Sequence, residues 1–365
     1  MIFDPASSKP PPQVINELST YLPYFYMNPL GLNALSTKAK ELLVRSRGII
    51  AEFLKTRNSE IIFTSSSTES NNLAIKGYLF GKKGSVITTD FEHPSIAHPL
   101  RTLEREDFNV LYLPTDRYGW IDPELVKEYV KEDTLLVTMG AVCRETATVR
   151  NVRKIIKIVK EVNPNTVCHF DFWGIYYPDQ VVDLSEVDMA SFDGPSLLGP
   201  QGIGFLYVKR GIRLKPIIEG GTQERGLRAG EENLFGIYAL AQSIKLLSEW
   251  RKAIENNISL CDNYIKDKMF LSPLFNSEMK APGLFSYGIN EVDVEMIITL
   301  LDKSGVFLGY PSPCIASGIK TKLKQKTGFD DVLSFRILPF TSLSEIESFI
   351  DYVQSIMERV KWTCS

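Results

Sequence analysis

The feature that most constrains the fold is an alternation of short apolar runs with segments of helical spacing over the first two thirds of the chain. This alternation predicts βαβ units, and therefore an α/β fold with a mostly parallel sheet covered by helices on both faces. Seven runs read as strands, at residues 60–65, 85–90, 109–114, 134–140, 167–172, 189–194 and 202–208. Because no helical pattern separates the last two, we expect one antiparallel neighbour in this seven-stranded sheet.

The last third of the chain has a different pattern. Helical spacing runs from Glu231 to about Phe270, and fewer apolar runs and two or three helices follow. We therefore expect a smaller α+β domain that the long helix joins to the first. Its expected strands lie at 283–289, 306–310 and 334–340. The expected large domain covers residues 15–252, and the expected small domain combines 1–14 with 253–365.

Composition narrows the classes of partner. The 365 residues carry a formal net charge of −3, so the basic bias typical of nucleic-acid-binding proteins is missing. The apolar runs are too short to cross a membrane as helices, and the N-terminal segment lacks the pattern of a secretion signal. We expect neither a nucleic acid nor a membrane as partner. The cysteines lack CxxC spacing, which argues against a metal site and favours a reducing cytoplasm; they are residues 143, 168, 261, 314 and 364.

Three polar positions follow predicted strands, where α/β sheets hold their ligands. Thr68 opens a predicted helix, which suits either a bound phosphate or a simple helix cap. His93 precedes another helix, and is either a ring that stacks on a flat ligand or a surface histidine. Asp171 ends a very apolar strand and therefore needs a partner. That partner is either the protonated ring nitrogen of a cofactor or a cap or salt bridge within the chain.

Two further segments are rich in glycine. Residues 219–233 combine glycines with charges ahead of the long helical pattern. They form either a loop that closes over a ligand or partner subunit, or a solvated connector. Cys314 lies in a loop rich in Pro, Ser and Gly. It is either a reactive thiol, because a nearby helix start lowers the pKa of a cysteine, or an inert one.

Several segments, taken in their order and spacing, together resemble one family. They read FDPASSKPPP, FTSSSTESNNLAIKG, TTDFEHPSI, HFDFWG, SFDGPSLLGPQGIGFLYVKRGIRLKPIIEGG, QERGLRAGEEN and FRILPFTSLSEIE. These segments are similar to those of the cysteine desulfurases of aminotransferase class V, over nearly the whole chain. The resemblance implies a homodimer of fold type I, with a large and a small domain, that uses pyridoxal 5′-phosphate (PLP).

The resemblance also implies roles for five residues. Thr68 would bind the cofactor phosphate, His93 would stack on the pyridine ring, and Asp171 would pair with the ring nitrogen. Cys314 falls where the family places the mobile-loop cysteine that receives sulfur as a persulfide. Arg336 matches the arginine that holds the substrate carboxylate.

Other positions depart from the family pattern, at the expense of cofactor binding. Pro195 and Ser196 replace a His–Lys pair, and a serine cannot form the imine that the lysine makes with PLP. Asp193 and Glu231 replace a serine and a partner-subunit threonine that bind the phosphate. Because unit charges about 4 Å apart interact by roughly 4 kcal/mol at an effective dielectric of 20, two carboxylates would cancel most of a cofactor's binding energy. Gly174 replaces the glutamine that contacts the phenolic oxygen of the cofactor. Cys143 and Arg144 replace a pair of asparagines.

These departures lead to three hypotheses. The first is a non-catalytic relative that acts as a scaffold or partner in iron–sulfur or sulfur-transfer assembly, with PLP weakly bound or absent and Cys314 as persulfide carrier or cluster ligand. The second is an enzyme that binds PLP without a Schiff base. The third is a site for a cationic or metal-bearing ligand, favoured by Asp193 and Glu231. The expected protein partners are a second copy of the chain, an iron–sulfur scaffold protein or an intact desulfurase paralogue.

Overall fold

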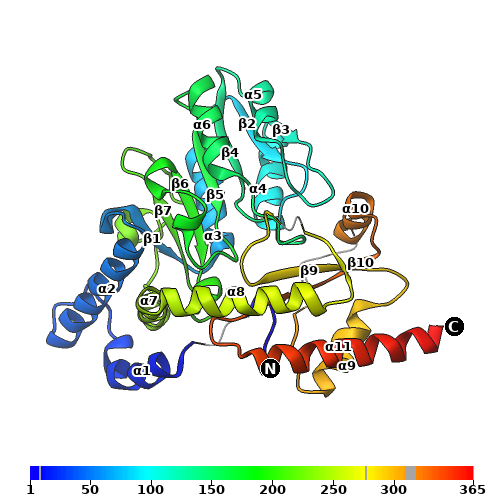
Figure 1. Cartoon of the computed structure of the whole chain (residues 1–365). Coiled ribbons are helices and arrows are strands. Elements are labelled where there is room, and N and C mark those ends of the chain that lie inside the picture. The colour runs from blue at the N-terminus through cyan, green and yellow to red at the C-terminus, as the bar shows by residue number, and fades with distance from the viewer. Residues whose placement is uncertain (8–9, 276–277, 310–317, 365) are drawn as a thin grey trace.

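The larger sheet of the protein has seven strands. It is seen in a computed structural model that describes residues 1–7, 10–275, 278–309 and 318–364 (Figure 1). The strands are β1 (Ile61–Thr64), β2 (Ser85–Thr89), β3 (Asn109–Leu113), β4 (Thr134–Gly140), β5 (Val167–Asp171), β6 (Met189–Asp193) and β7 (Gly204–Val208). Their order is β1-β7-β6-β5-β4-β2-β3, with β7 antiparallel to both neighbours and all other pairs parallel. The expected fold class and the antiparallel neighbour are confirmed.

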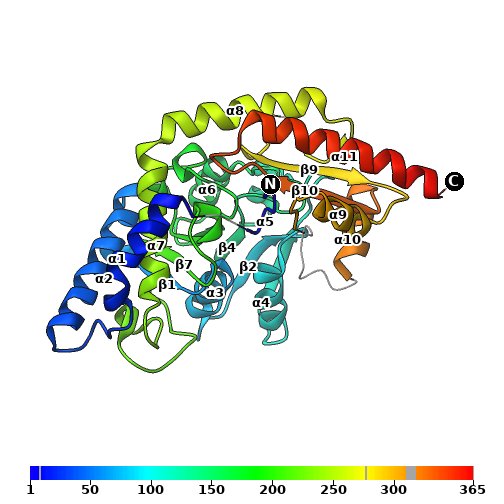
Figure 2. The same cartoon turned by 90° about the horizontal axis from the view of Figure 1, so that it is seen from below.

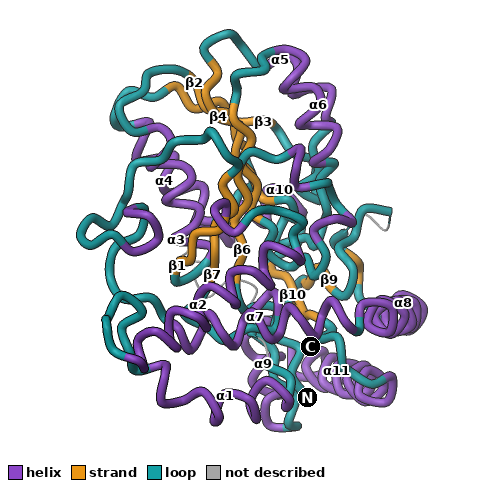
Figure 3. The backbone as a smooth tube through the Cα atoms, turned by 90° about the vertical axis from the view of Figure 1, so that its left-hand side faces the viewer, coloured by secondary structure: helices purple, strands orange, loops and turns teal. Residues whose placement is uncertain are grey.

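Helices cover both faces of this sheet, as Figure 3 shows. One face carries Phe170 and Phe192 and packs against helices that include α2 (Ala34–Phe53), α5 (Val126–Tyr129), α6 (Val152–Val162) and α7 (Leu234–Glu249). The other face carries Val167 and Met189 and packs against α3 (Ser67–Asn72), the π-helical turn Leu73–Gly77 and α4 (Pro94–Glu104). Helix α1 (Pro12–Phe25) lies outside these layers against α7, with the ring centroids of Tyr21 and Tyr238 4.9 Å apart.

Helix α6 has the bounds that its sequence predicts. The side chain of Asn151 accepts a hydrogen bond from the backbone N–H of Lys154 and caps the first turn. Apolar residues at Val152, Ile155, Ile156 and Val159 follow the helical repeat and are all buried. The helix ends before Pro164 because a proline restricts the residue that precedes it.

The smaller sheet is antiparallel, in the order β10-β9-β8, and has its own core. Its strands are β8 (Ser272–Pro273), β9 (Leu284–Ile289) and β10 (Asp331–Arg336), and its helices are α8 (Arg251–Lys268), α9 (Val294–Lys303), α10 (Gly318–Thr327) and α11 (Leu343–Cys364). Helices α8 and α11 lie side by side (Figure 2). The start of the chain joins this core, because the ring of Phe3 lies 4.5 Å from that of Phe349. The exact domain boundaries stay a prediction.

Two local expectations were wrong. The helical pattern from Glu231 to Phe270 forms two helices rather than one, because Trp250 (φ −105°, ψ 12°) leaves the helical conformation between α7 and α8. The run 306–310 forms no strand in its described part. Phe307 makes only an isolated parallel bridge with Ile2.

The described residues contain neither a candidate membrane span nor a candidate metal-binding cluster. No helix there is both long and apolar enough to span a membrane. Over the same ranges, no group of three or more His, Cys, Asp and Glu side chains is placed to hold a metal ion.

Candidate functional site

The candidate site lies where β5 and β6 end, on the sheet face that α3 and α4 cover. Side chains alternate along a strand, so Val167, His169 and Asp171 of β5 share this face. In β6 the same alternation places Asp193 on the face of Met189. Because β5 and β6 are parallel neighbours, their carboxyl ends bring both carboxylates to one edge of the sheet.

Asp171 is buried and has three hydrogen-bond donors. Its Oδ2 accepts from Nδ2 of Asn71 at 2.9 Å and from Nη2 of Arg144 at 3.0 Å. Its Oδ1 accepts from the backbone N–H of Trp173 at 3.1 Å. The sequence left the partner of Asp171 open between a cofactor and the chain itself, and here the partner is a salt bridge to Arg144.

Arg144 is fixed at the tip of a turn that follows β4. The turn closes through backbone bonds between residues 141 and 150 and between 143 and 148, and it is anchored because the N–H of Ala141 donates to the carbonyl of Asp171 at 2.8 Å. The guanidinium of Arg144 also donates to Oγ of Ser67 at 3.2 Å and lies 4.7 Å from the ring centroid of Trp173. Only 16% of the Arg144 side chain is exposed.

His93 is joined to Asp171 by a chain of hydrogen bonds. It caps α4, where its Nδ1 accepts from the backbone N–H of Ser95 at 3.2 Å. The hydroxyl of Ser95 lies 2.8 Å from the same nitrogen and accepts from Asn71, which also donates to Asp171. Burial, and after it the charge of Arg144 with Nη1 3.5 Å from Nε2, holds the pKa of His93 well below its usual value. The ring is therefore a neutral, partly buried member of the site rather than a surface histidine.

Asp193 faces the start of α3. Its Oδ1 accepts a long hydrogen bond of 3.4 Å from the backbone N–H of Ser67. Burial raises the pKa of Asp193, and the nearby charge of Arg144 opposes that rise. The first turn of α3 is held close to β7, since a Cβ added at Gly204 would lie 2.7 Å from the backbone carbon of Ser66. Only a glycine allows this close approach.

Ser196 is buried in the turn that follows β6. Its hydroxyl accepts from the backbone N–H of Gly174 at 3.2 Å, and its carbonyl accepts from Nη2 of Arg336 at 2.8 Å. The turn closes on itself, because the N–H of Gly194 donates to the carbonyl of Ile203 at 2.9 Å. Lys209, the next lysine in the sequence, donates to the carbonyl of Ser185 near the opposite end of β6 and β7.

Arg336 is fully buried at the end of β10. Its guanidinium lies 4.0 Å from the ring centroid of Tyr176, whose hydroxyl donates to the carbonyl of Ile337. Two of its nitrogens, Nε and Nη1, have no hydrogen-bond partner among the described residues. Burial lowers the pKa of Arg336. Its assignment to a substrate carboxylate stays a prediction, since the hydrogen bond that its side chain makes within the described part of the chain is to the backbone of Ser196.

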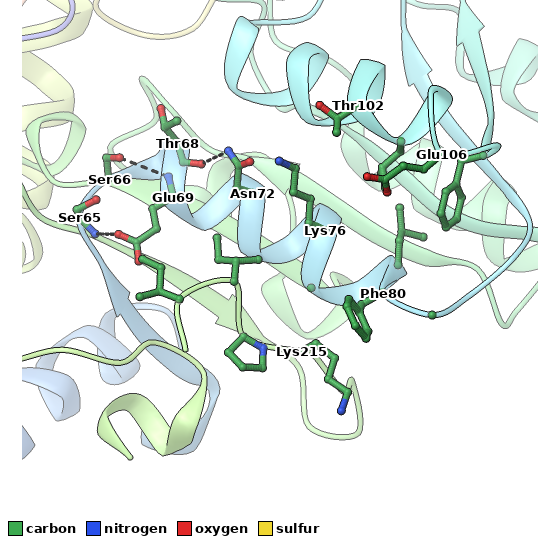
Figure 4. Close-up of a pocket in the computed structure, with 18 residues that line it drawn as sticks. Ser65, Ser66, Thr68, Glu69, Asn72, Lys76, Phe80, Thr102, Glu106 and Lys215 are labelled. Atoms are coloured by element: carbon green, nitrogen blue, oxygen red, sulfur yellow. Dashed lines mark hydrogen bonds between the residues drawn. The ribbon is translucent and has the colours of Figure 1, made fainter. Parts of the chain in front are cut away.

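Thr68 lies on a different face of α3 from Ser67 and Asn71. It is exposed and lines a cleft of about 880 Å³ with Asn72, Lys76 and Lys215 (Figure 4). In that view Thr68, Asn72 and Lys76 follow one another along the helix toward the cleft. The carbonyl of Thr68 accepts from the side chain of Asn72 at 3.0 Å. A phosphate role for Thr68 stays a prediction.

Several side chains anchor the segment 219–233 to the rest of the chain, and among them Arg228 forms an ion pair with Glu69 at 3.1 Å. Glu224 is buried, and its carboxylate forms a two-pronged ion pair with Arg47 at 2.6 and 2.7 Å. Glu231 is exposed, with its Oε1 accepting from Nδ2 of Asn28 at 3.2 Å. Its expected reach toward a partner subunit stays a prediction. Cys314 lies outside the described residues.

A family model described as aminotransferase class-V matches residues 1–327. The chain belongs to this family. A NifS/IcsS protein homolog of Lactobacillus delbrueckii subsp. bulgaricus is 33% identical, covering 97% of this chain and 95% of the relative. The cysteine desulfurase IscS 1 of Archaeoglobus fulgidus is 28% identical, covering 98% and 97%. A solved structure titled NifS-like protein superposes with a TM-score of 0.88 at 25% identity, covering 98% and 99%.

PLP is the cofactor that this aminotransferase class-V membership implies, and the residues present do not fit it. At Asp171, which the resemblance assigns to the ring nitrogen, Oδ2 already accepts from Asn71 and Arg144. At Asp193, which the resemblance assigns to the phosphate site, a carboxylate faces the N–H of Ser67. Ser196 stands where the resemblance places the Schiff-base lysine. Among the described residues, no lysine hydrogen-bonds Asp171, Asp193 or Ser196.

The structure adds residues that sequence reasoning did not place. Ser67, Asn71 and Trp173 all contact the Asp171–Arg144 pair. Ser67 and Asn71 could have been found from their spacing, because residues four apart share a helix face. Arg144 was noticed as a departure from the family, but nothing in the sequence indicates where its side chain points.

Proposed function

We propose that this aminotransferase class-V protein is a cysteine-desulfurase-like partner protein that does not desulfurate cysteine and acts as a scaffold in iron–sulfur or sulfur-transfer assembly. The observation that carries the proposal is the buried Ser196 hydroxyl, which stands where the family has an amine and is already bonded to the N–H of Gly174. A hydroxyl cannot form an imine with an aldehyde, so the covalent link on which the family's chemistry depends is missing.

The names of similar proteins support the part of the proposal that concerns sulfur transfer. Proteins named cysteine desulfurase match this chain over nearly its whole length, which supports a role in sulfur transfer. The arrangement of the site points away from the chemistry itself. Nδ1 of His93 is bonded to Ser95, and its Nε2 lies 3.5 Å from the guanidinium of Arg144, which Asp171 holds in place. The chain's own groups therefore occupy both ring nitrogens.

The catalytic half of the proposal is tested with the freshly purified protein. We expect no absorption band of bound PLP, and no sulfide release when cysteine, PLP and a reductant are supplied. An intact cysteine desulfurase, assayed in parallel, controls for the reagents. A cofactor band together with cysteine-dependent sulfide would refute this half.

The partner half is tested by tagged co-expression with an intact desulfurase paralogue and with an iron–sulfur scaffold protein, followed by measurement of the mass of each complex in solution. We expect a stable complex with at least one of them, or an effect on the sulfide output of the intact enzyme. Recovery of the protein only as a self-associated species, with no such effect, would contradict a partner role. The cytoplasm as its compartment stays a prediction.

A second candidate is an enzyme that binds PLP, or its amine form, without a covalent bond. What favours it is the retained chain of His93, Ser95, Asn71 and Asp171, which could still orient a pyridine ring. Calorimetry with pyridoxal and pyridoxamine 5′-phosphates separates the candidates. Binding of either compound at micromolar concentration would favour the enzyme, and absence of heat with both would remove it.

A further inference from the structure

We propose that Arg144 is a built-in occupant of the ring position, so that the chain's own guanidinium takes the place of a pyridinium ring between Asp171, His93 and Trp173. The proposal rests on the proposed function, because it says how the site of a non-desulfurating relative is closed. It also supplies a cation near Asp193, whereas Glu231, the other acidic residue expected to attract one, is exposed and bonded to Asn28.

The contacts of Arg144 match those of a planar cation. Its Nη2 reaches Oδ2 of Asp171 at 3.0 Å, where the family's ring N–H would donate. Its plane lies over Trp173 at 4.7 Å, and its Nη1 lies 3.5 Å from the ring of His93. A guanidinium is flat and permanently charged, so it can replace a protonated aromatic ring both in charge and in stacking.

The electrostatics of the pocket favour this occupant over an anionic ligand. Asp171 and Asp193 supply two carboxylates. Arg144 forms a salt bridge with the first, and at longer range its charge opposes the rise in the pKa of the second. A bound phosphate would meet Asp193 where the N–H of Ser67 is already shared. An anionic ligand would therefore have to break the ion pair of Arg144 with Asp171 and also approach the carboxylate of Asp193. Both steps cost free energy.

Backbone hydrogen bonds fix the turn that carries Arg144. The turn that carries it is closed by bonds between Cys143 and Thr148 and between Ala141 and Arg150, and Ala141 is bonded to the backbone of Asp171. Arg150 in turn is fully buried and forms an ion pair with Glu92. A turn anchored at both ends keeps the guanidinium within reach of Asp171 and lowers the entropy lost when the pair forms.

The experiment compares the affinity for pyridoxamine 5′-phosphate, which needs no Schiff base, in two variants. Asp193→Ser removes the carboxylate at the phosphate position, and Asp193→Ser/Arg144→Asn also removes the occupant. We expect the double variant to bind at least about tenfold more tightly than the single one. Asp193→Ser/Arg153→Asn, which loses an exposed arginine instead, should bind like the single variant. Equal affinities in folded Asp193→Ser and Asp193→Ser/Arg144→Asn would overturn the proposal.

A second measurement needs no ligand. In NMR spectra of the unaltered protein, the guanidinium protons of Arg144 should exchange with solvent more slowly than those of Arg153. In an NMR titration, Arg144→Asn should raise the pKa of His93. Arg144→Gln replaces Arg144→Asn if that variant does not fold. Fast exchange in the unaltered protein contradicts the proposal whatever the variants do. The two failures remain distinct. Cofactor and sulfide release in the unaltered protein would defeat the proposed function, whereas an inactive protein whose variants gain no affinity would defeat only this inference.

Discussion

Nη2 of Arg144 lies 3.0 Å from Oδ2 of Asp171, and this pair joins the turn after β4 to the end of β5. Asp171 is 2% exposed and Arg144 16%, so the pair is largely shielded from solvent. The pair therefore has consequences for stability that can be measured without any assay of function.

Breaking the pair should destabilise the fold. Arg144→Ala leaves the Asp171 carboxylate buried with only the donors of Asn71 and Trp173, and we expect the free energy of unfolding to fall by about 3 kcal/mol. Urea unfolding at neutral pH measures it. Arg153→Ala is the control, because its ion pair with Glu186 is long and exposed and should contribute less than about 0.5 kcal/mol. Similar losses in both variants would mean that the buried pair has no special role.

His169 should make the protein sensitive to acid. It lies between hydroxyls of Thr138 and Ser191 on three adjacent strands, and burial lowers its pKa to about 4 from the ordinary 6.5. The unfolded chain binds this proton at a higher pH than the folded chain does, so stability is lost as the pH falls from 6.5 toward 4. At about 1.4 kcal/mol per pKa unit, the loss is of the order of 3 kcal/mol.

The measurement is the free energy of unfolding across that range of pH. His169→Gln should flatten its decline, whereas His98→Gln, at an exposed position on α4, should not. If the two variants had the same pH profile as the unaltered protein, the acid sensitivity would have another source.

Glu224 should hold the segment 219–233 against β1. Its carboxylate meets Arg47 at 2.6 and 2.7 Å and also accepts from the backbone N–H of Phe63 at 2.9 Å. Glu224→Ala leaves a buried guanidinium without its partner, and we expect a loss of about 3 kcal/mol in thermal or urea unfolding. Glu41→Ala removes an exposed ion pair with Lys38 and should cost far less than Glu224→Ala. A ranking of the two in the opposite order would show that the segment is not anchored at Glu224.

Two glycine-to-alanine changes should act in opposite directions. At Gly204 an added Cβ would lie 2.7 Å from the backbone of Phe192 and of Ser66, neither of which can turn aside, so we expect a loss of about 1–3 kcal/mol. At Gly48, inside α2, the nearest atom is 3.8 Å away, and alanine should add about 0.5–1 kcal/mol because it favours the helix. Differential scanning calorimetry measures whether each variant is more or less stable than the unaltered protein. Stabilisation by Gly204→Ala would contradict the close approach of α3 to β7.

Much of the fold could be predicted because it depends on local patterns. The strand that ends at Asp171 is a run of apolar residues, and the helix at 152–162 has both its cap and its repeat in the sequence. The break at Trp250 could not be predicted, since the helical repeat continues through it. Of the site, the absence of a lysine from residues 191–204 is read directly from the sequence.

The chain by itself determined which chemical groups are available: a hydroxyl at residue 196, a carboxylate at 193 and an arginine at 144. Only the tertiary structure decided that Arg144 meets Asp171, which lies 27 residues away along the chain. That meeting depends on the register of two parallel strands and on a turn that directs one long side chain across their ends. Short-range sequence patterns specify the period of an element, whereas the contact between two distant charges is set by how the elements pack.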